Sequence, residues 1–128
     1  MNLATLDKKT IEETFFPFET VEVDPNGIDQ HAPGAKLDSG KIKAGLLVDF
    51  SNALLAVAEV GTFGANKYTR GGWQHVENGV ERYTDAMFRH FLKEPIEPND
   101  PDSDLKHAAH AAWNALARLE LILRNQEA

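Results

Sequence analysis

Apolar residues recur at helical spacing in three stretches of the chain. Between Ala44 and Gly64 they fall at every third or fourth position, at Leu46, Leu47, Phe50, Leu54, Val57 and Val60. The same spacing returns over residues 80–92. It appears again from Ser103 or Asp104, either of which can cap a helix, to about Asn125. Glycines at 71 and 72 and prolines at 95, 98 and 101 separate the stretches. The pattern predicts three helices and no sheet.

The third stretch differs from the other two because it is apolar on most of its circumference. It holds six alanines, at positions 108, 109, 111, 112, 115 and 117. Small side chains let a neighbouring helix approach closely, and a helix that is apolar nearly all round is normally buried. We therefore expect an all-α helical bundle over residues 36–128. Residues 1–35, which are rich in proline and glycine, predict an irregular N-terminal arm.

The composition of the chain argues against several classes of protein. The 128 residues carry a net charge of −7 and no cysteine. The charge argues against a duplex nucleic acid partner, and the missing thiols exclude disulfides and cysteine nucleophiles. The longest apolar run, Leu46 to Val60, is interrupted by polar residues, so no membrane segment and a cytoplasmic location are expected. The acids are concentrated: residues 94–104 hold five acids and no base.

Acidic side chains line the first two predicted helices. Asp49, Asn52 and Glu59 lie within about 80° of one another on a helix, which is either a solvated face or a face where Glu59 binds a metal. On the second helix, Glu81 and Asp85 are four residues apart, and so are Asp85 and Arg89. This spacing suits helical ion pairs as well as a metal site.

Histidines mark the third helix. His107, His110 and Asn114 share one face among alanines and leucines, which predicts either a buried polar network or a ligand pocket. The loop before the second helix carries Lys67, Tyr68 and Trp73 beside several glycines. Cations and aromatic rings on such a loop suit a nucleotide, or alternatively the tryptophan anchors the loop to the bundle. Neither a phosphate-binding P-loop nor a dinucleotide-binding glycine motif is present.

Taken together, these segments have a familiar order. The chain carries Asp38-Ser39-Gly40-Lys41, Gly64-Ala65-Asn66-Lys67-Tyr68, Trp73, the helix Arg82 to His90, and His107-Ala108-Ala109-His110 followed by Asn114. Over residues 36–125 it resembles a phage family of dATP/dGTP diphosphohydrolases. That family includes the MazZ proteins and is related to the all-α MazG-like nucleotide pyrophosphohydrolases. The sequence departs from the MazG-like acidic pattern at Ala56, where an acid is expected.

The resemblance implies hydrolysis of a purine deoxynucleoside triphosphate, most simply dGTP to dGMP with release of pyrophosphate or of phosphate in steps. Such a product can feed synthesis of 2-aminoadenine nucleotides for a modified phage genome. The chemistry needs Mg²⁺ or Mn²⁺. The implied catalytic residues are Glu59, Asp85 and His110, and the implied metal ligands are Glu59, Glu81, Asp85 and Glu94. The implied nucleotide contacts are Lys41, Lys67, Tyr68, Trp73, Arg89, His90, His107 and Asn114.

Three helices make a thin bundle for such a site, so we expect a homo-oligomer, a dimer or a tetramer, with the alanine-rich helix near the interface. The alternative hypothesis is a non-catalytic nucleotide-binding or interaction module with the same fold. A substrate panel separates the two hypotheses.

Overall fold

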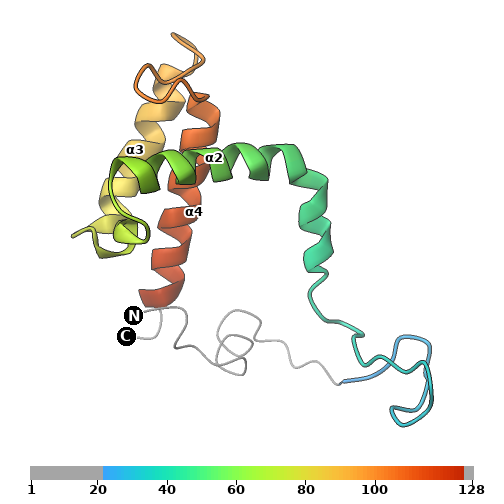
Figure 1. The fold of residues 1–128 in the computed structure, drawn as a ribbon. Helices are drawn as coiled ribbons and strands as arrows, with labels where there is room; N and C mark the ends of the chain where they lie inside the picture. Colours follow the sequence, from blue (N-terminus) through green and yellow to red (C-terminus); the bar gives the residue numbers. More distant parts are fainter. Residues whose placement is uncertain (1–21, 126–128) are drawn as a thin grey trace. The chain divides into compact units, whose positions relative to one another are not determined.

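The computed structural model describes residues 22–125, and those residues are helical or irregular. They form a 3₁₀ helix η2 (Ala44–Phe50), α2 (Ser51–Lys67), a short 3₁₀ helix η3 (Gly72–His75), α3 (Gly79–Lys93) and α4 (His107–Asn125) (Figure 1). Within this part of the chain the β pairing is a single isolated bridge between Asn99 and Lys106. The all-α prediction is therefore confirmed. Most of the predicted arm, residues 1–21, lies outside the described residues.

The three predicted helices are present with shifted ends. The first continues past Gly64 to Lys67, and its first seven residues take the tighter 3₁₀ form. The third begins at His107, so the start predicted at Ser103 or Asp104 is wrong by about one turn. Asp104 has a left-handed backbone, with φ of 59°, that a helix cannot continue through. The Ser103 side chain contacts Asp100 and His110, and it caps no helix.

The chain divides into two compact units, one that ends at Val48 and one that starts at Asp49. In the first unit, the carboxylate of Asp24 organises the turns. Its Oδ1 accepts the backbone N–H of Asn26 at 2.7 Å, and its Oδ2 accepts that of Lys36 at 2.8 Å. The bond from Lys36 is the main reason why the pKa of Asp24 is lowered. Lys41 pairs with Glu22 at 3.3 Å in the same unit.

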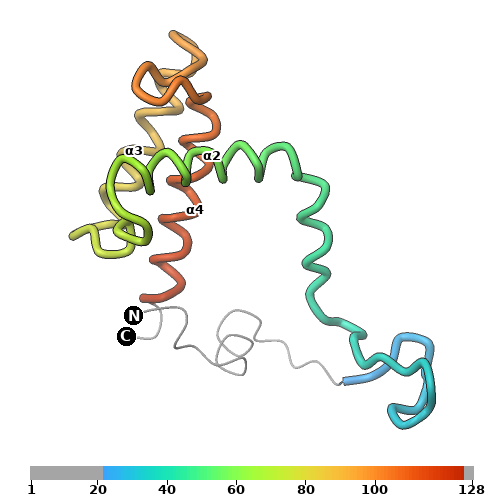
Figure 2. The backbone as a smooth tube through the Cα atoms, viewed as in Figure 1, coloured from blue at the N-terminus to red at the C-terminus, as the bar shows by residue number. Residues whose placement is uncertain are grey.

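The second unit is built on the hairpin of α3 and α4, which the loop from Glu94 to Lys106 joins at one end (Figure 2). Gly79 at the start of α3 is buried against α4, because a Cβ there would lie 2.7 Å from Cδ1 of Leu121. α2 packs on α4 beside this hairpin, where Gly61 faces the indole of Trp113. Alanines on α4 form most of the buried apolar core together with Val60, namely Ala109, Ala111 and Ala117.

An aromatic cluster holds η3 against the hairpin. Trp73, Tyr83 and Trp113 meet edge to face with centroids 5.7–6.4 Å apart. The Tyr83 hydroxyl donates to the carbonyl of Trp73 at 2.7 Å, and the guanidinium of Arg124 lies over the Trp73 ring. Such pairs add to the free energy of burial. The loop before α3 is thus anchored to the bundle by its tryptophan.

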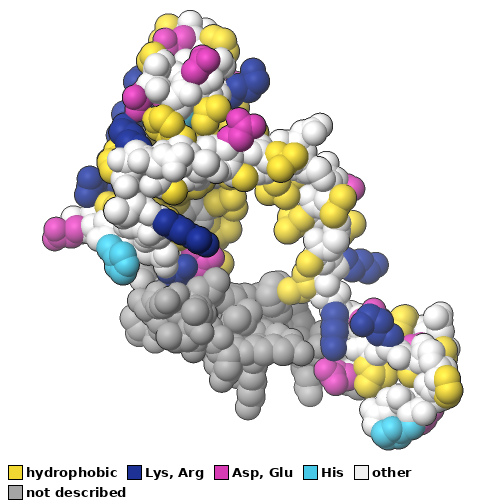
Figure 3. All heavy atoms as spheres, viewed as in Figure 1, with side chains coloured by type: hydrophobic (Ala, Val, Ile, Leu, Met, Phe, Trp, Pro, Cys, Tyr) yellow, Lys and Arg dark blue, Asp and Glu magenta, His cyan; other side chains and the backbone are white. Residues whose placement is uncertain are grey.

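Large apolar side chains remain exposed along η2 and α2, where Figure 3 shows hydrophobic atoms gathered on the surface. Leu47, Phe50 and Leu55 are each more than half exposed. Ala44–Lys67 forms a 24-residue helical stretch with a mean hydropathy of 1.5 over its most apolar window. By length and composition this one stretch could cross a membrane. The core helix of a soluble protein passes the same test of length and composition. The expected absence of a membrane segment stays a prediction.

Candidate functional site

The loop between α3 and α4 folds back on itself and onto the start of α4. The backbone N–H of Asp100 donates to the carbonyl of Leu105 at 2.7 Å, and that of Asp104 donates to the carbonyl of Asp100 at 2.8 Å. The N–H of His107 donates to the carbonyl of Pro98 at 2.9 Å. These bonds hold the side chains of the loop beside the first turns of α4.

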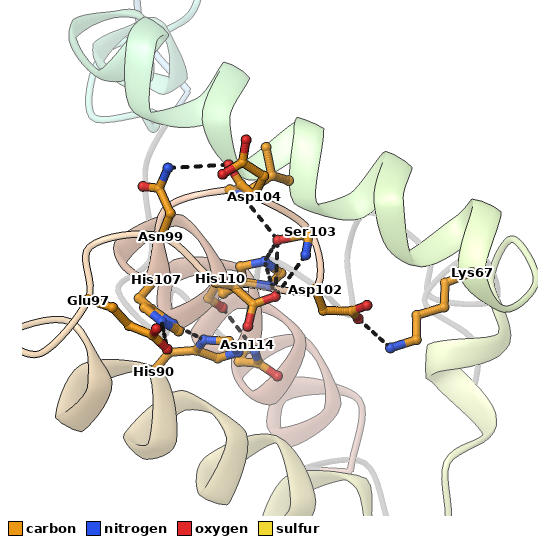
Figure 4. A network of polar contacts seen from close by, with 12 residues as sticks. Lys67, His90, Glu97, Asn99, Asp102, Ser103, Asp104, His107, His110 and Asn114 are labelled. Carbon is orange, nitrogen blue, oxygen red and sulfur yellow. Dashed lines mark hydrogen bonds and ion pairs between the residues drawn. The ribbon is translucent and has the colours of Figure 1, made fainter.

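Three histidines meet at this end of the hairpin (Figure 4). His90 comes from α3, and His107 and His110 come from α4. The Nδ1 atoms of His90 and His107 lie 2.8 Å apart, and the rings of His90 and His110 stack at 4.6 Å with an interplanar angle of 10°. The His107 side chain is fully buried. The structure therefore confirms that a polar network lies on the face of α4 that carries His107 and His110.

Ser103 joins the loop to this network. Its Oγ lies 2.6 Å from Nε2 of His110 and accepts the backbone N–H of Leu105 at 3.1 Å. Both the N–H and the Oγ of Ser103 contact Oδ2 of Asp100, at 3.0 and 3.2 Å. The same oxygen lies 3.9 Å from Nε2 of His110. The Asp100 carboxylate thus sits at the edge of the histidine cluster.

The surroundings favour the neutral imidazoles of His90 and His110 and the ionised carboxylate of Asp100. Burial is the main cause that lowers the pKa of His90 to about 4, and repulsion from protonated His110 and His107 acts in the same direction. Burial also lowers the pKa of His110, although Asp100 opposes that shift. For Asp100, burial alone would raise the pKa, but the hydrogen bonds from Ser103 outweigh it and the pKa is lowered. Near neutral pH the cluster therefore presents nitrogen lone pairs beside a negative oxygen.

This arrangement is suited to a metal ion. One nitrogen each of His90 and His107 and one carboxylate oxygen of Asp100 all lie within 4.8 Å of one another. Nε2 of His107 is buried without a hydrogen-bond partner in the described structure. Neutral imidazoles and a carboxylate are common ligands of divalent metals. The three residues can therefore hold one ion.

The structure brings together four of the residues implied by the resemblance, namely His90, His107, His110 and Asn114. Asn114 is buried and donates from Nδ2 to the carbonyl of His110 at 2.9 Å. Lys67 joins the edge of this group, since its Nζ lies 2.7 Å from Asp102 in the same loop. The hydrogen bond that the Lys67 ammonium donates to the Asp102 carboxylate is the main cause that raises the pKa of Lys67. Tyr68 is largely exposed, with the Lys67 ammonium 5.4 Å from its ring.

The other implied residues in the same unit are not part of the histidine cluster. The four acids implied as metal ligands are exposed, and among the described residues they are not part of the group that could hold a metal: Glu59, Glu81, Asp85 and Glu94. Arg89 is exposed on α3, and Trp73 packs in the aromatic cluster. Lys41 belongs to the other unit. The roles assigned to these residues stay predictions.

Sequence reasoning missed four residues of the loop, namely Glu97, Asp100, Asp102 and Ser103. Their acidity was visible as a local excess of charge, but nothing in the spacing assigned them to a site. A useful signal was present, because a proline-constrained acidic loop directly precedes a helix that begins with two histidines.

Comparison with known protein families gives a match over most of the chain. The family model described as "dATP/dGTP diphosphohydrolase, N-terminal" matches residues 31–128. The chain belongs to the dATP/dGTP diphosphohydrolase family. No curated protein and no solved structure gives a significant match.

Membership in the dATP/dGTP diphosphohydrolase family confirms the resemblance found in the sequence. The matched range contains the entire histidine cluster and the loop that supports it. The family description indicates a hydrolase that acts on purine deoxynucleoside triphosphates. A substrate of this kind carries several negative charges, which a divalent ion and nearby cations can neutralise.

Proposed function

We propose that this protein hydrolyses a purine deoxynucleoside triphosphate in a reaction that depends on a divalent metal, Mg²⁺ or Mn²⁺. The preferred reaction is dGTP to dGMP, with release of pyrophosphate or of phosphate in steps. The observation that carries the proposal is the convergence of ligand atoms from His90, Asp100 and His107 within 4.8 Å, inside the region that matches the family.

The residues of the cluster have distinct roles in this proposal. His90, Asp100 and His107 hold the ion, which when bound neutralises the polyphosphate and lowers the pKa of a water. His110, kept neutral by burial, accepts a proton from the attacking water. The Ser103 hydroxyl fixes the orientation of the His110 ring.

Cations and rings at the edge of the cluster bind the substrate in this proposal. Lys67 contacts the phosphates after it leaves Asp102, and Tyr68, which is next to it in the chain, contacts the base. Arg89 and Lys41 are further candidates for phosphate contacts, and Trp73 for a base contact. Glu59, Glu81, Asp85 and Glu94 are candidates for a second set of metal ligands that substrate or another subunit would draw together.

Several wider expectations belong to the same proposal. The reaction supplies a phage nucleotide pool in the host cytoplasm or removes unwanted nucleotides from it. The product can serve the synthesis of 2-aminoadenine DNA. The protein acts as a homo-oligomer without duplex nucleic acid or membrane partners. The apolar side chains exposed on η2 and α2 support self-association, since large exposed apolar patches mark interaction surfaces.

A panel of purine and pyrimidine triphosphates, assayed with and without metal and with products identified, tests this proposal. We expect turnover of dGTP and dATP that a chelator abolishes. Asp100→Asn should reduce that turnover by about 100-fold or more, because one anionic ligand is lost. Asp49→Asn, an exposed substitution away from the cluster, is the matched control. Absence of turnover on every triphosphate would exclude the proposed reaction.

The alternative function is a non-catalytic module that binds nucleotide or a partner. The exposed and separate positions of Glu59 and Asp85 favour it, because hydrolases of the MazG type use acids of this kind on their helices. This alternative predicts saturable dGTP binding without product formation in the same panel.

A further inference from the structure

The contact between His90 and His107 joins two nitrogens of the same kind. Both atoms are Nδ1, and they lie 2.8 Å apart. A hydrogen bond between two imidazoles needs a proton on one nitrogen and a bare lone pair on the other. A divalent ion that replaces this shared proton meets two nitrogen lone pairs that already converge.

The opposite nitrogen of His107 shows a second unusual feature. Nε2 is buried, has no hydrogen-bond partner in the described structure, and lies 3.5 Å from Oε1 of Glu97. A buried N–H without a partner is costly. Histidine ligands commonly donate the N–H of their other nitrogen to a carboxylate, which fixes the tautomer and the ring orientation. Glu97 is in position to provide that carboxylate when Nδ1 binds a metal.

The third ligand completes a mixed set of donors. Within the described structure the Asp100 carboxylate contacts Ser103 and His110 through Oδ2, so Oδ1 remains for a metal. The set then contains two imidazole nitrogens and one carboxylate oxygen. Mg²⁺ is normally bound by oxygen ligands, whereas imidazole favours first-row transition metals in the order Mn²⁺ < Co²⁺ < Ni²⁺, with Zn²⁺ also strongly bound.

We infer that His90, Asp100 and His107 form a site that selects a divalent transition metal over Mg²⁺, with Glu97 as the positioning residue for His107. The catalytic meaning of the site rests on the proposed function, whereas its metal binding does not. Three protein ligands leave coordination positions for water and for phosphate oxygens.

Metal binding to the full chain, stripped with a chelator and free of nucleotide, tests the inference. Titration calorimetry with Mg²⁺, Mn²⁺, Co²⁺ and Zn²⁺ should give one ion per chain for the three transition metals. The affinity should rise from Mn²⁺ to Co²⁺, and both should exceed that of Mg²⁺ by at least about tenfold. The visible absorption of bound Co²⁺ reports nitrogen ligands independently of activity. Equal affinity for Mg²⁺ and Co²⁺ would overturn the inference.

Variants assign the ligands. His90→Ala and Asp100→Asn should abolish binding of Co²⁺ at micromolar protein, and His75→Ala, on an exposed residue of η3, should leave it unchanged. Glu97→Gln should weaken binding by about 10- to 100-fold, whereas the matched substitution Glu77→Gln should not. Because His90 and Glu97 are only partly buried, these variants keep the fold, which circular dichroism checks. Loss of binding in Glu59→Gln and Asp85→Asn, with His90→Ala unaffected, would also overturn the inference.

The results separate this inference from the proposed function. Tight Co²⁺ binding without turnover of any triphosphate would support the metal site and exclude the proposed hydrolase function. Metal-dependent turnover that is unchanged in His90→Ala would support the proposed hydrolase function and exclude a metal site formed by His90, Asp100 and His107.

Discussion

The hydroxyl of Ser103 lies 2.6 Å from Nε2 of His110 and joins the loop between α3 and α4 to the buried face of α4. The same oxygen accepts the N–H of Leu105 and contacts the carboxylate of Asp100. One side chain therefore supports both the loop and the histidine cluster.

Removal of this hydroxyl should destabilise the protein. In Ser103→Ala, the N–H of Leu105 and Nε2 of His110 both lose a partner in a partly buried place, which should cost about 1–3 kcal/mol of unfolding free energy. Urea denaturation measures the change. Thr62→Ala is the matched control, since its hydroxyl donates only to the Ala58 carbonyl on an exposed helix face, and it should change the stability by less than about 0.5 kcal/mol. Equal effects of the two substitutions would contradict the role of Ser103.

The lowered pKa of His90 makes the stability of the metal-free protein depend on pH. The folded-state value of about 4 lies below the ordinary value of 6.5, so between these values the unfolded chain binds more protons. The contribution of neutral His90 to the free energy of unfolding is therefore fully present above pH 6.5, and it is lost as the pH falls toward 4. The loss should be about 1–2 kcal/mol, smaller than full linkage gives, because solvent screens a partly exposed ring.

Urea denaturation at pH 7, 6, 5 and 4.5 measures this dependence. His90→Gln should flatten the curve, although part of the slope should remain because the pKa of His110 is lowered as well. His75→Gln is the control and should keep the slope of the unsubstituted protein. A slope that is the same in His90→Gln would show that His90 does not titrate as described.

The ion pair between Lys67 and Asp102 should compete with substrate. Lys67 has to exchange the Asp102 carboxylate, 2.7 Å away, for a phosphate oxygen. We expect Lys67→Ala to raise the KM for dGTP by roughly three- to tenfold, as the loss of one exposed charge-assisted contact would do. Asp102→Asn should lower the KM because the cation is released. Steady-state kinetics measures both, with Lys93→Ala as the control; a KM that rises in Asp102→Asn would contradict the competition.

The hydroxyl of Tyr83 should contribute to stability. Tyr83→Phe removes the hydrogen bond to the carbonyl of Trp73 and leaves that oxygen without its partner, at a cost of about 1–2 kcal/mol. Thermal unfolding measures the effect. Tyr68→Phe is the matched substitution on a largely exposed tyrosine, and its unfolding temperature should not change measurably. Equal unfolding temperatures of the two variants would show that the bond contributes little.

The exposed apolar side chains of α2 should support self-association. Leu55 is 67% exposed, and Leu54 lines an apolar groove of about 480 Å³ between α2 and α4. Leu55→Glu should shift the protein toward monomer, because a charge is costly to bury in an interface. Sedimentation at micromolar concentration measures the oligomeric state, with Leu92→Glu on α3 as the control. A monomeric unsubstituted protein would exclude the homo-oligomer.

The hydrophobic periodicity predicted the helices well because it reflects local geometry. Three helices appear where apolar residues recur at helical spacing, and the alanine-rich α4 packs against both α2 and α3. The ends were less predictable. Asp104 and Ser103 have the residue types of helix caps, but contacts with the loop and with His110 determine their conformations.

The candidate site was predictable only in part. The spacing of His107, His110 and Asn114 was enough to place them on one buried face, since residues three and four apart on a helix lie together. His90, Glu97 and Asp100 come from another helix and from a loop without periodicity. Their approach to His107 depends on the packing of α3 against α4 and on the backbone hydrogen bonds of the loop.

The helical class, the order of the helices and the family were all predictable from the amino-acid sequence, because each depends on local spacing or on residue identity along the chain. The tertiary structure decided which polar residues meet. It left Glu59 and Asp85 exposed and brought His90, Asp100 and His107 within 4.8 Å of one another. The physical reason is that a metal site needs donors from separate elements at fixed distances, and only the packed fold sets those distances.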